Sequence, residues 1–147
     1  MKIFFALLFA LSGTAFAEPV TLNVNFSLEI CDQQPDGSAD CTLEGDPTIR
    51  VQLDGRSEPS VWSKKMTAEE HDFIATIGLV RYSDGDRLIF RSEIDPNHAP
   101  GNPAQVSFKL SDWRKLNEFL FEPEPYRKGT RTFQPRLQVT ASPSRGI

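Results

Sequence analysis

A strict alternation of apolar and polar residues runs through positions 20–30, with the sequence VTLNVNFSLEI. Every second residue is apolar, and each residue between them is polar. Because successive side chains of a strand point to opposite faces, this period of two predicts a half-buried strand. A helix would scatter the same apolar side chains around its circumference. The chain must therefore build a sheet that covers a core with one face.

Shorter alternating segments repeat this pattern along the chain and are separated by turn signals. The turns "LDGRSEP" (53–59) and "YSDGDR" (82–87, with Asp84-Gly85 at its centre) are typical, and the sequence holds eleven prolines and nine glycines. The pattern predicts an all-β fold, a single antiparallel β-sandwich of about seven or eight short strands, with an open barrel as the second interpretation. The further strands are expected at 49–53, 61–66, 73–79, 88–94, 106–110 and 133–139.

One segment departs from the period of two. Trp113, Leu116 and Leu120 follow one another at spacings of three and four, and Ser111 or Asp112 could cap a helix. This spacing predicts one short helix near 112–120, with Trp113 packed in the core.

The first seventeen residues have the features of a secretory signal peptide. Lys2 precedes an apolar run at 3–11, and Ala15-Phe16-Ala17 has the small-x-small pattern of a cleavage site. We therefore expect a secreted protein, periplasmic or extracellular, with no membrane span after cleavage. A single domain would occupy 18–141, and residues 142–147 would form a flexible tail.

Export into an oxidising compartment suggests how the only two cysteines, Cys31 and Cys41, are used. An even count of cysteines predicts a disulfide, here closing a short loop. Asp32, Asp36 and Asp40 lie between or beside them, and their oxygens make them weak calcium candidates. The ordered acidic loop of known calcium motifs is absent, and solvated turn residues are the favoured interpretation. We expect no cofactor.

Neither histidine is expected to bind a metal. His71 and His98 have no close histidine or cysteine partner in the sequence, whereas a zinc site needs three or four ligands with at least one close pair. Both are expected to be exposed loop residues.

The charge is unevenly distributed. Without Lys2 the chain has 15 basic and 20 acidic residues, which argues against general nucleic-acid binding. A basic run in 126–136 contains no acid, and it is a candidate patch for an anionic partner. The favoured alternative is that these cations face the protein's own acids. The partner-binding candidates are Arg127, Lys128, Arg131 and Arg136, together with Trp62 as a surface aromatic for sugars, although half-buried packing of Trp62 is favoured.

Catalytic motifs are absent from the sequence. It has no Gly-x-Ser-x-Gly elbow, no glycine-rich phosphate loop and no Cys-x-x-Cys pair. We expect a non-enzymatic binding or interaction module of the periplasm or cell envelope, with a protein or an envelope polymer as partner. Two alternatives are an inhibitor of an exported hydrolase such as a lysozyme, acting through the acidic loop 32–40, and a calcium-dependent lectin-like or adhesion-like domain. A small hydrolase is the less favoured third class.

Overall fold

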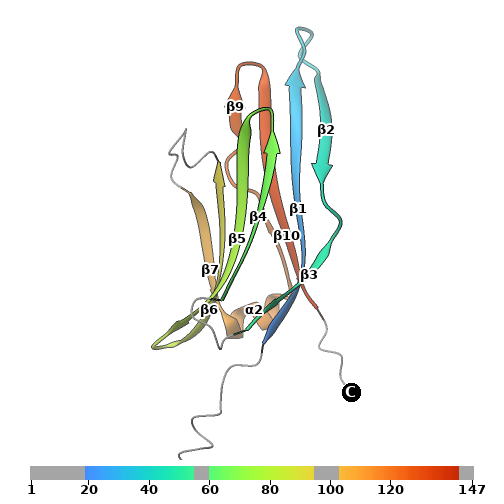
Figure 1. Ribbon diagram of the computed structural model, residues 1–147. Coiled ribbons are helices and arrows are strands. Elements are labelled where there is room, and N and C mark those ends of the chain that lie inside the picture. Colours follow the sequence, from blue (N-terminus) through green and yellow to red (C-terminus); the bar gives the residue numbers. More distant parts are fainter. Residues whose placement is uncertain (1–18, 55–59, 95–102, 143–147) are drawn as a thin grey trace, which may run out of the picture.

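The chain forms two antiparallel sheets packed face to face, which confirms the predicted all-β sandwich. The computed structural model describes residues 19–54, 60–94 and 103–142 (Figure 1). This described part contains ten strands and one helix, so the expected number of strands was too low.

The six-stranded sheet is built around two long central strands, β1 (Val20–Gln33) and β10 (Arg131–Ala141). They pair antiparallel from Leu22 opposite Ala141 to Asp32 opposite Arg131. The other edge of β1 pairs with β2 (Ala39–Gly45) and β3 (Ile49–Leu53), and the other edge of β10 pairs with β8 (Glu118–Phe121) and β9 (Tyr126–Lys128).

The four-stranded sheet follows chain order, β4-β5-β6-β7. Its strands are β4 (Ser60–Ala68), β5 (His71–Tyr82), β6 (Gly85–Ile94) and β7 (Ala104–Lys109). The turn between β5 and β6 differs in register from the expectation, because Gly85 pairs with Tyr82 and the central residues are Ser83 and Asp84. The left-handed φ of +126° at Gly85 explains the glycine there.

The core lies between the sheets, and its residues are the apolar ones of the alternating sequence pattern. Along β1 the even-numbered residues from Val20 to Ile30 are buried and the odd-numbered ones are half-buried on the outer face. Phe73 and Phe90 of the four-stranded sheet are fully buried opposite them, and Phe133 is fully buried beside them on β10. Burying one such side chain stabilises the fold by roughly 1.5–3 kcal/mol, so β1 alone ties the two sheets together strongly.

The one helix among the described residues, α2 (Leu110–Leu116), follows β7 and lies at the end of the sandwich where β1 begins (Figure 1). Trp113 is buried as predicted, with its ring 5.6 Å from that of Phe90. The helix ends earlier than expected because Asn117 adopts a left-handed φ of 62° and redirects the chain into β8. Leu116 and Leu120 are about half exposed, so their predicted place on an apolar helix face was wrong.

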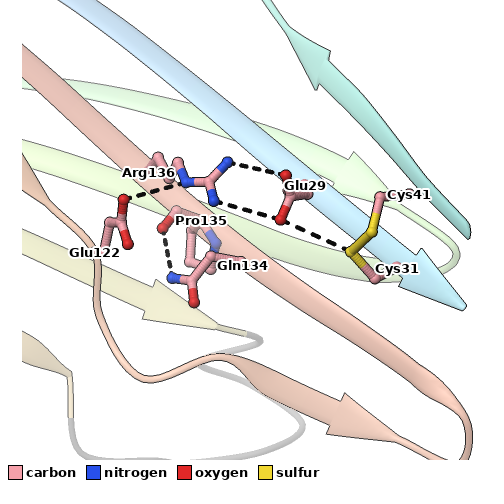
Figure 2. Close-up of polar contacts among 7 residues, drawn as sticks. All are labelled: Glu29, Cys31, Cys41, Glu122, Gln134, Pro135 and Arg136. Carbon is pink, nitrogen blue, oxygen red and sulfur yellow. Dashed lines mark hydrogen bonds and ion pairs between the residues drawn. A yellow bond between two sulfur atoms is a disulfide. The ribbon is translucent and has the colours of Figure 1, made fainter. Parts of the chain in front are cut away.

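Pro135 stands within the central strand β10, where a missing backbone N–H is normally excluded. On the edge of β10 away from β1, β9 pairs up to Phe133 and β8 pairs from Leu137 onward, so the residues between them have no neighbouring strand. Pro135 lies in this gap, opposite Leu28 of β1. The side-chain amide of Gln134 enters this gap and donates to the carbonyl oxygens of Pro123 (2.8 Å) and Pro135 (3.0 Å; Figure 2). A side chain thus replaces the missing neighbour strand, and β10 stays continuous.

Candidate functional site

The hairpin of residues 27–45, which we call the stapled arm, contains the one strand of the described residues that is exposed throughout. It comprises the second half of β1, the turn 34–38 and β2, and it lies at the end of the sandwich opposite α2 (Figure 1). All seven residues of β2 are exposed, and Leu43 keeps 66% of its surface accessible. In the described part of the chain β2 pairs only with β1, so no second layer covers it.

The disulfide predicted from the cysteine count fixes the two strands of the arm. Cys31 and Cys41 lie directly opposite in the register, at bonding distance and with their Cα atoms 4.1 Å apart. The bond is typical of a protein that folds in an oxidising compartment, and it is compatible with the expected export.

The turn of the arm is a tight three-residue loop. The N–H of Gly37 donates to the carbonyl of Gln34 (3.0 Å), and Gly37 takes a left-handed φ of 89° that suits glycine. The carboxylate of Asp36 accepts hydrogen bonds from the N–H (2.9 Å) and hydroxyl (2.5 Å) of Ser38. These bonds favour the ionised form, and they hold the pKa of Asp36 below its usual 3.8.

The three aspartates proposed as weak calcium ligands do not share one set of contacts. Asp36 closes its own turn, and Asp32 accepts a hydrogen bond from the Thr130 hydroxyl (2.8 Å) in the neighbouring hairpin. Among the described residues, the one cluster with metal-ligand spacing is Glu29, Cys31 and Cys41, and its sulfurs are joined in the disulfide. Asp32, Asp36 and Asp40 therefore form no metal-ligand cluster. Asp84 lies at the opposite end of the sandwich (Figure 1).

An ion-pair network lies on the outer face beside the disulfide (Figure 2). Arg136 of β10 donates two bonds to the carboxylate of Glu29 (3.1 and 3.3 Å) and one from Nε to Glu122 (3.3 Å). The hydrogen bond to Glu29 is the main cause that raises the pKa of Arg136. The Cys31 sulfur lies 3.7 Å from Glu29 Oε1, a packing contact because a disulfide sulfur carries no proton. The network holds β1 and the segment after β8 against β10 at the base of the arm.

The basic run does not present its four cations as one patch. Arg136 serves the network just described, and Arg131 forms an ion pair with Glu69 in the turn between β4 and β5. The Nζ of Lys128 lies 3.5 Å from Nε2 of His71, whereas Arg127 is exposed on β9. Two of the four candidates are thus paired with the protein's own acids.

Trp62 lies on β4, which belongs to the other sheet from the basic run. It is half-buried against the core and lines a small cavity of about 30 Å³ with Phe26, Ile49 and Lys64. Lys64 forms an ion pair with Asp46 (2.9 Å) beside it. The indole therefore packs at the edge between the sheets, and no flat exposed platform for a sugar is formed.

His71 was expected to be an exposed loop residue, and this was wrong. It is only 9% exposed at the start of β5, with its ring 5.1 Å from that of Tyr126 and 5.7 Å from that of Phe133. It thereby joins the four-stranded sheet to β9 and β10. His98 lies outside the described residues.

Sequence reasoning missed the strain in the turn before His71. Glu69 and Glu70 both adopt left-handed φ angles, 50° and 69°, where asparagine and glycine are the usual residues. Each left-handed non-glycine residue costs roughly 1–2 kcal/mol, and the Glu69–Arg131 pair offsets only part of that cost.

A cavity at the α2 end of the sandwich offers little that resembles an active site. It has a volume of about 270 Å³ and lies where β1, α2 and the end of β10 meet. Its polar lining consists of Thr21, Arg114, Asn117 and Ser142, without a histidine, cysteine or carboxylate among the lining residues.

Comparison with known proteins does not extend this description. No family model, no curated protein and no solved structure matches the chain. None of the helices in the described part is long and apolar enough to span a membrane.

Proposed function

We propose that the protein is a non-enzymatic, extracytoplasmic interaction module that binds a protein partner through the stapled arm. The observation that carries the proposal is β2, a strand of seven residues that is exposed throughout and held in place by a disulfide. Pre-ordering a binding element lowers the entropy that must be lost on association, so a stapled strand suits recognition. The disulfide and the predicted signal peptide support a location outside the cytoplasm.

Site-specific photo-crosslinking in cells of the source organism tests this proposal. A photo-reactive amino acid at Ser38, on the arm, should give a discrete adduct with a second protein. The matched control is Ser83, an equally exposed turn residue at the opposite end of the sandwich, which should give none. The Ser38 adduct should weaken when Asp36 and Asp40 are changed to asparagine. Equal adducts from both ends, or none from the arm, would contradict an arm-based interaction.

The charge of the arm favours a second, sharper function, inhibition of a basic exported hydrolase such as a lysozyme. Residues 27–45 contain five acids and no base. A narrow, rigid and negative element fits a basic cleft, and long-range attraction speeds the encounter. The test is a titration of the mature protein against a basic lysozyme, which should lose activity with a stoichiometric end point. A flat activity curve at high protein concentration would exclude this target.

A further inference from the structure

The register of the arm determines which backbone groups of β2 remain open. Directly opposite residues of an antiparallel pair alternate between hydrogen-bonded pairs, about 5.5 Å apart at Cα, and non-hydrogen-bonded pairs, about 4.5 Å apart. The Cα separation of 4.1 Å assigns Cys31 and Cys41 to the second kind. A hydrogen bond leads to the same assignment, because the N–H of Gln33 donates to the carbonyl oxygen of Thr130 (2.9 Å). The backbone N–H groups of every second residue in a strand face the same neighbour. The N–H of Cys31 therefore faces β10, away from β2.

The same alternation then applies along β2. Asp40, Thr42 and Glu44 form the hydrogen-bonded pairs with β1. The N–H and C=O groups of Ala39, Cys41, Leu43 and Gly45 point the other way, toward the free edge. No strand in the described part of the chain pairs with this edge. The arm thus presents a row of open backbone donors and acceptors, in a strand that the disulfide ties to β1.

Such an edge invites another strand, and proteins usually block it with lysines, prolines or bulges. The edge strand of the other sheet, β4, carries Lys64 and Lys65 in its middle. In contrast, β2 has neither a lysine nor a proline, and its charged residues are Asp40 and Glu44. Both acids lie on the face of the arm that Leu28 and Ile30 share, whereas Leu43 lies on the outer face with Glu29.

These charges decide which occupant fits. If β2 of a second copy paired antiparallel about Thr42, Asp40 of each copy would lie opposite Glu44 of the other. Like charges directly opposite destabilise a strand pair, so self-pairing in this register is disfavoured. A strand with cations on one face and apolar residues on the other would instead pair its cations with Asp40 and Glu44 and cover Leu43, which is 66% exposed.

We infer that the partner adds an extended segment to the free edge of β2, with lysine or arginine at alternate positions facing Asp40 and Glu44. This inference rests on the proposed function and specifies its mode, β-strand addition, and the chemistry of the bound segment. Backbone hydrogen bonds to Cys41 and Leu43 supply the common attraction, and the alternating cations supply selectivity.

The probe is a capped peptide of about seven residues that alternates lysine with valine or threonine, compared with its glutamate-for-lysine counterpart. Binding is measured by fluorescence anisotropy at low ionic strength. The lysine peptide should bind about tenfold or more tightly than the glutamate peptide, because opposite charges attract and like charges repel across the pair. Added salt should weaken it. In amide exchange experiments, the peptide should slow exchange at Cys41 and Leu43.

A matched pair of variants isolates the backbone contact. Leu43→Pro removes one outward N–H at a position where an edge strand tolerates proline, and it should weaken the lysine peptide about tenfold. Leu43→Thr shortens the same side chain but keeps the N–H, so it should lose only apolar contact and weaken the lysine peptide clearly less than Leu43→Pro does. If Leu43→Pro fails to fold, the exchange of Cys41 and Leu43 in the native protein still decides the matter.

The outcomes separate this inference from the proposed function. Equal binding to Leu43→Pro, equal affinity for both peptides, or unchanged exchange at Cys41 and Leu43 would overturn strand addition. If any of these three results occurs while the Ser38 crosslink persists, the arm still binds a partner, but in another way. Loss of the crosslink as well overturns both. A concentration-dependent dimer that Leu43→Pro abolishes would make a second copy the occupant and would also overturn the inference.

Discussion

Removing the staple by the double substitution Cys31→Ser and Cys41→Ser should open the arm while the sandwich stays folded. β2 pairs with β1 alone in the described part of the chain, and none of its residues is buried. β1 is held independently by β10, with which it pairs from Leu22 to Asp32. The arm can therefore unzip without separating the two sheets, so the disulfide stabilises a local equilibrium more than the global one.

The size of the effect follows from the length of the closed loop. The two cysteines are 10 residues apart in sequence, and the loop-entropy relation for that length gives about 2.5–3 kcal/mol. Since each 1.4 kcal/mol is a factor of ten, the open population of the arm should rise roughly 100-fold. The midpoint of thermal unfolding should change by only a few degrees, because the core between the sheets is unaltered.

Amide hydrogen exchange followed by NMR measures this local opening. The N–H groups of Asp40, Thr42 and Glu44 bond to β1 in the intact arm, and their exchange should accelerate about 100-fold in the double variant. Amides in the core of β10, such as that of Val139, serve as the internal control and should keep their rates. If the three β2 amides kept native exchange rates, or if Val139 accelerated equally, the reasoning that the arm opens alone would be refuted.

Four further changes test other features of the structure. Glu70→Gly should raise stability by about 0.5–1 kcal/mol, because relief of the left-handed strain exceeds the added chain entropy; a lower melting temperature would contradict this. Gly45→Ala should destabilise the base of the arm, since a Cβ there would lie 3.0 Å from the Cβ of Ser27, and faster exchange in β2 without global unfolding should report it. A double-mutant cycle of Arg136→Ala with Glu29→Gln should show a coupling of about 1 kcal/mol that shrinks in salt, whereas additive effects would mean that the pair contributes nothing. The lowered pKa of Asp36 means that its turn is stabilised above pH 3.8 and loses that contribution as the pH falls further; Asp36→Ala should therefore flatten the acid end of the stability curve measured by denaturant unfolding.

The parts of the fold that the sequence predicts well are those where one face is buried against the core. The alternation at 20–30 reappears as the buried and half-buried faces of β1, and Phe73 and Ile77 of β5 follow the same rule. The disulfide was predictable for a different reason, since two cysteines in an exported chain leave little choice of pairing.

The strands that escaped prediction are those without a buried face. All of β2 is exposed, so it carries no hydrophobic period to detect, although the Asp36-Gly37 turn and the opposed cysteines hint at a hairpin. β8 was mistaken for the end of a helix because Trp113, Leu116 and Leu120 happen to lie at helical spacing. What overrides that spacing is the left-handed Asn117 and the pairing of β8 with β10, and both depend on residues distant in sequence.

The charges of the candidate site could be counted from the sequence but not placed. The basic run was a candidate partner surface, with pairing to the protein's own acids as the favoured interpretation, and Arg131 and Arg136 do pair with Glu69 and Glu29 of the same chain. The acids of β2 and of the turn before it have the opposite environment. In the described part of the chain, Asp36, Asp40 and Glu44 form no ion pair, so their field extends into solvent. Internal pairing therefore occupies two of the four cations of the basic run, and the unpaired acids support our proposal that the arm attracts a basic partner.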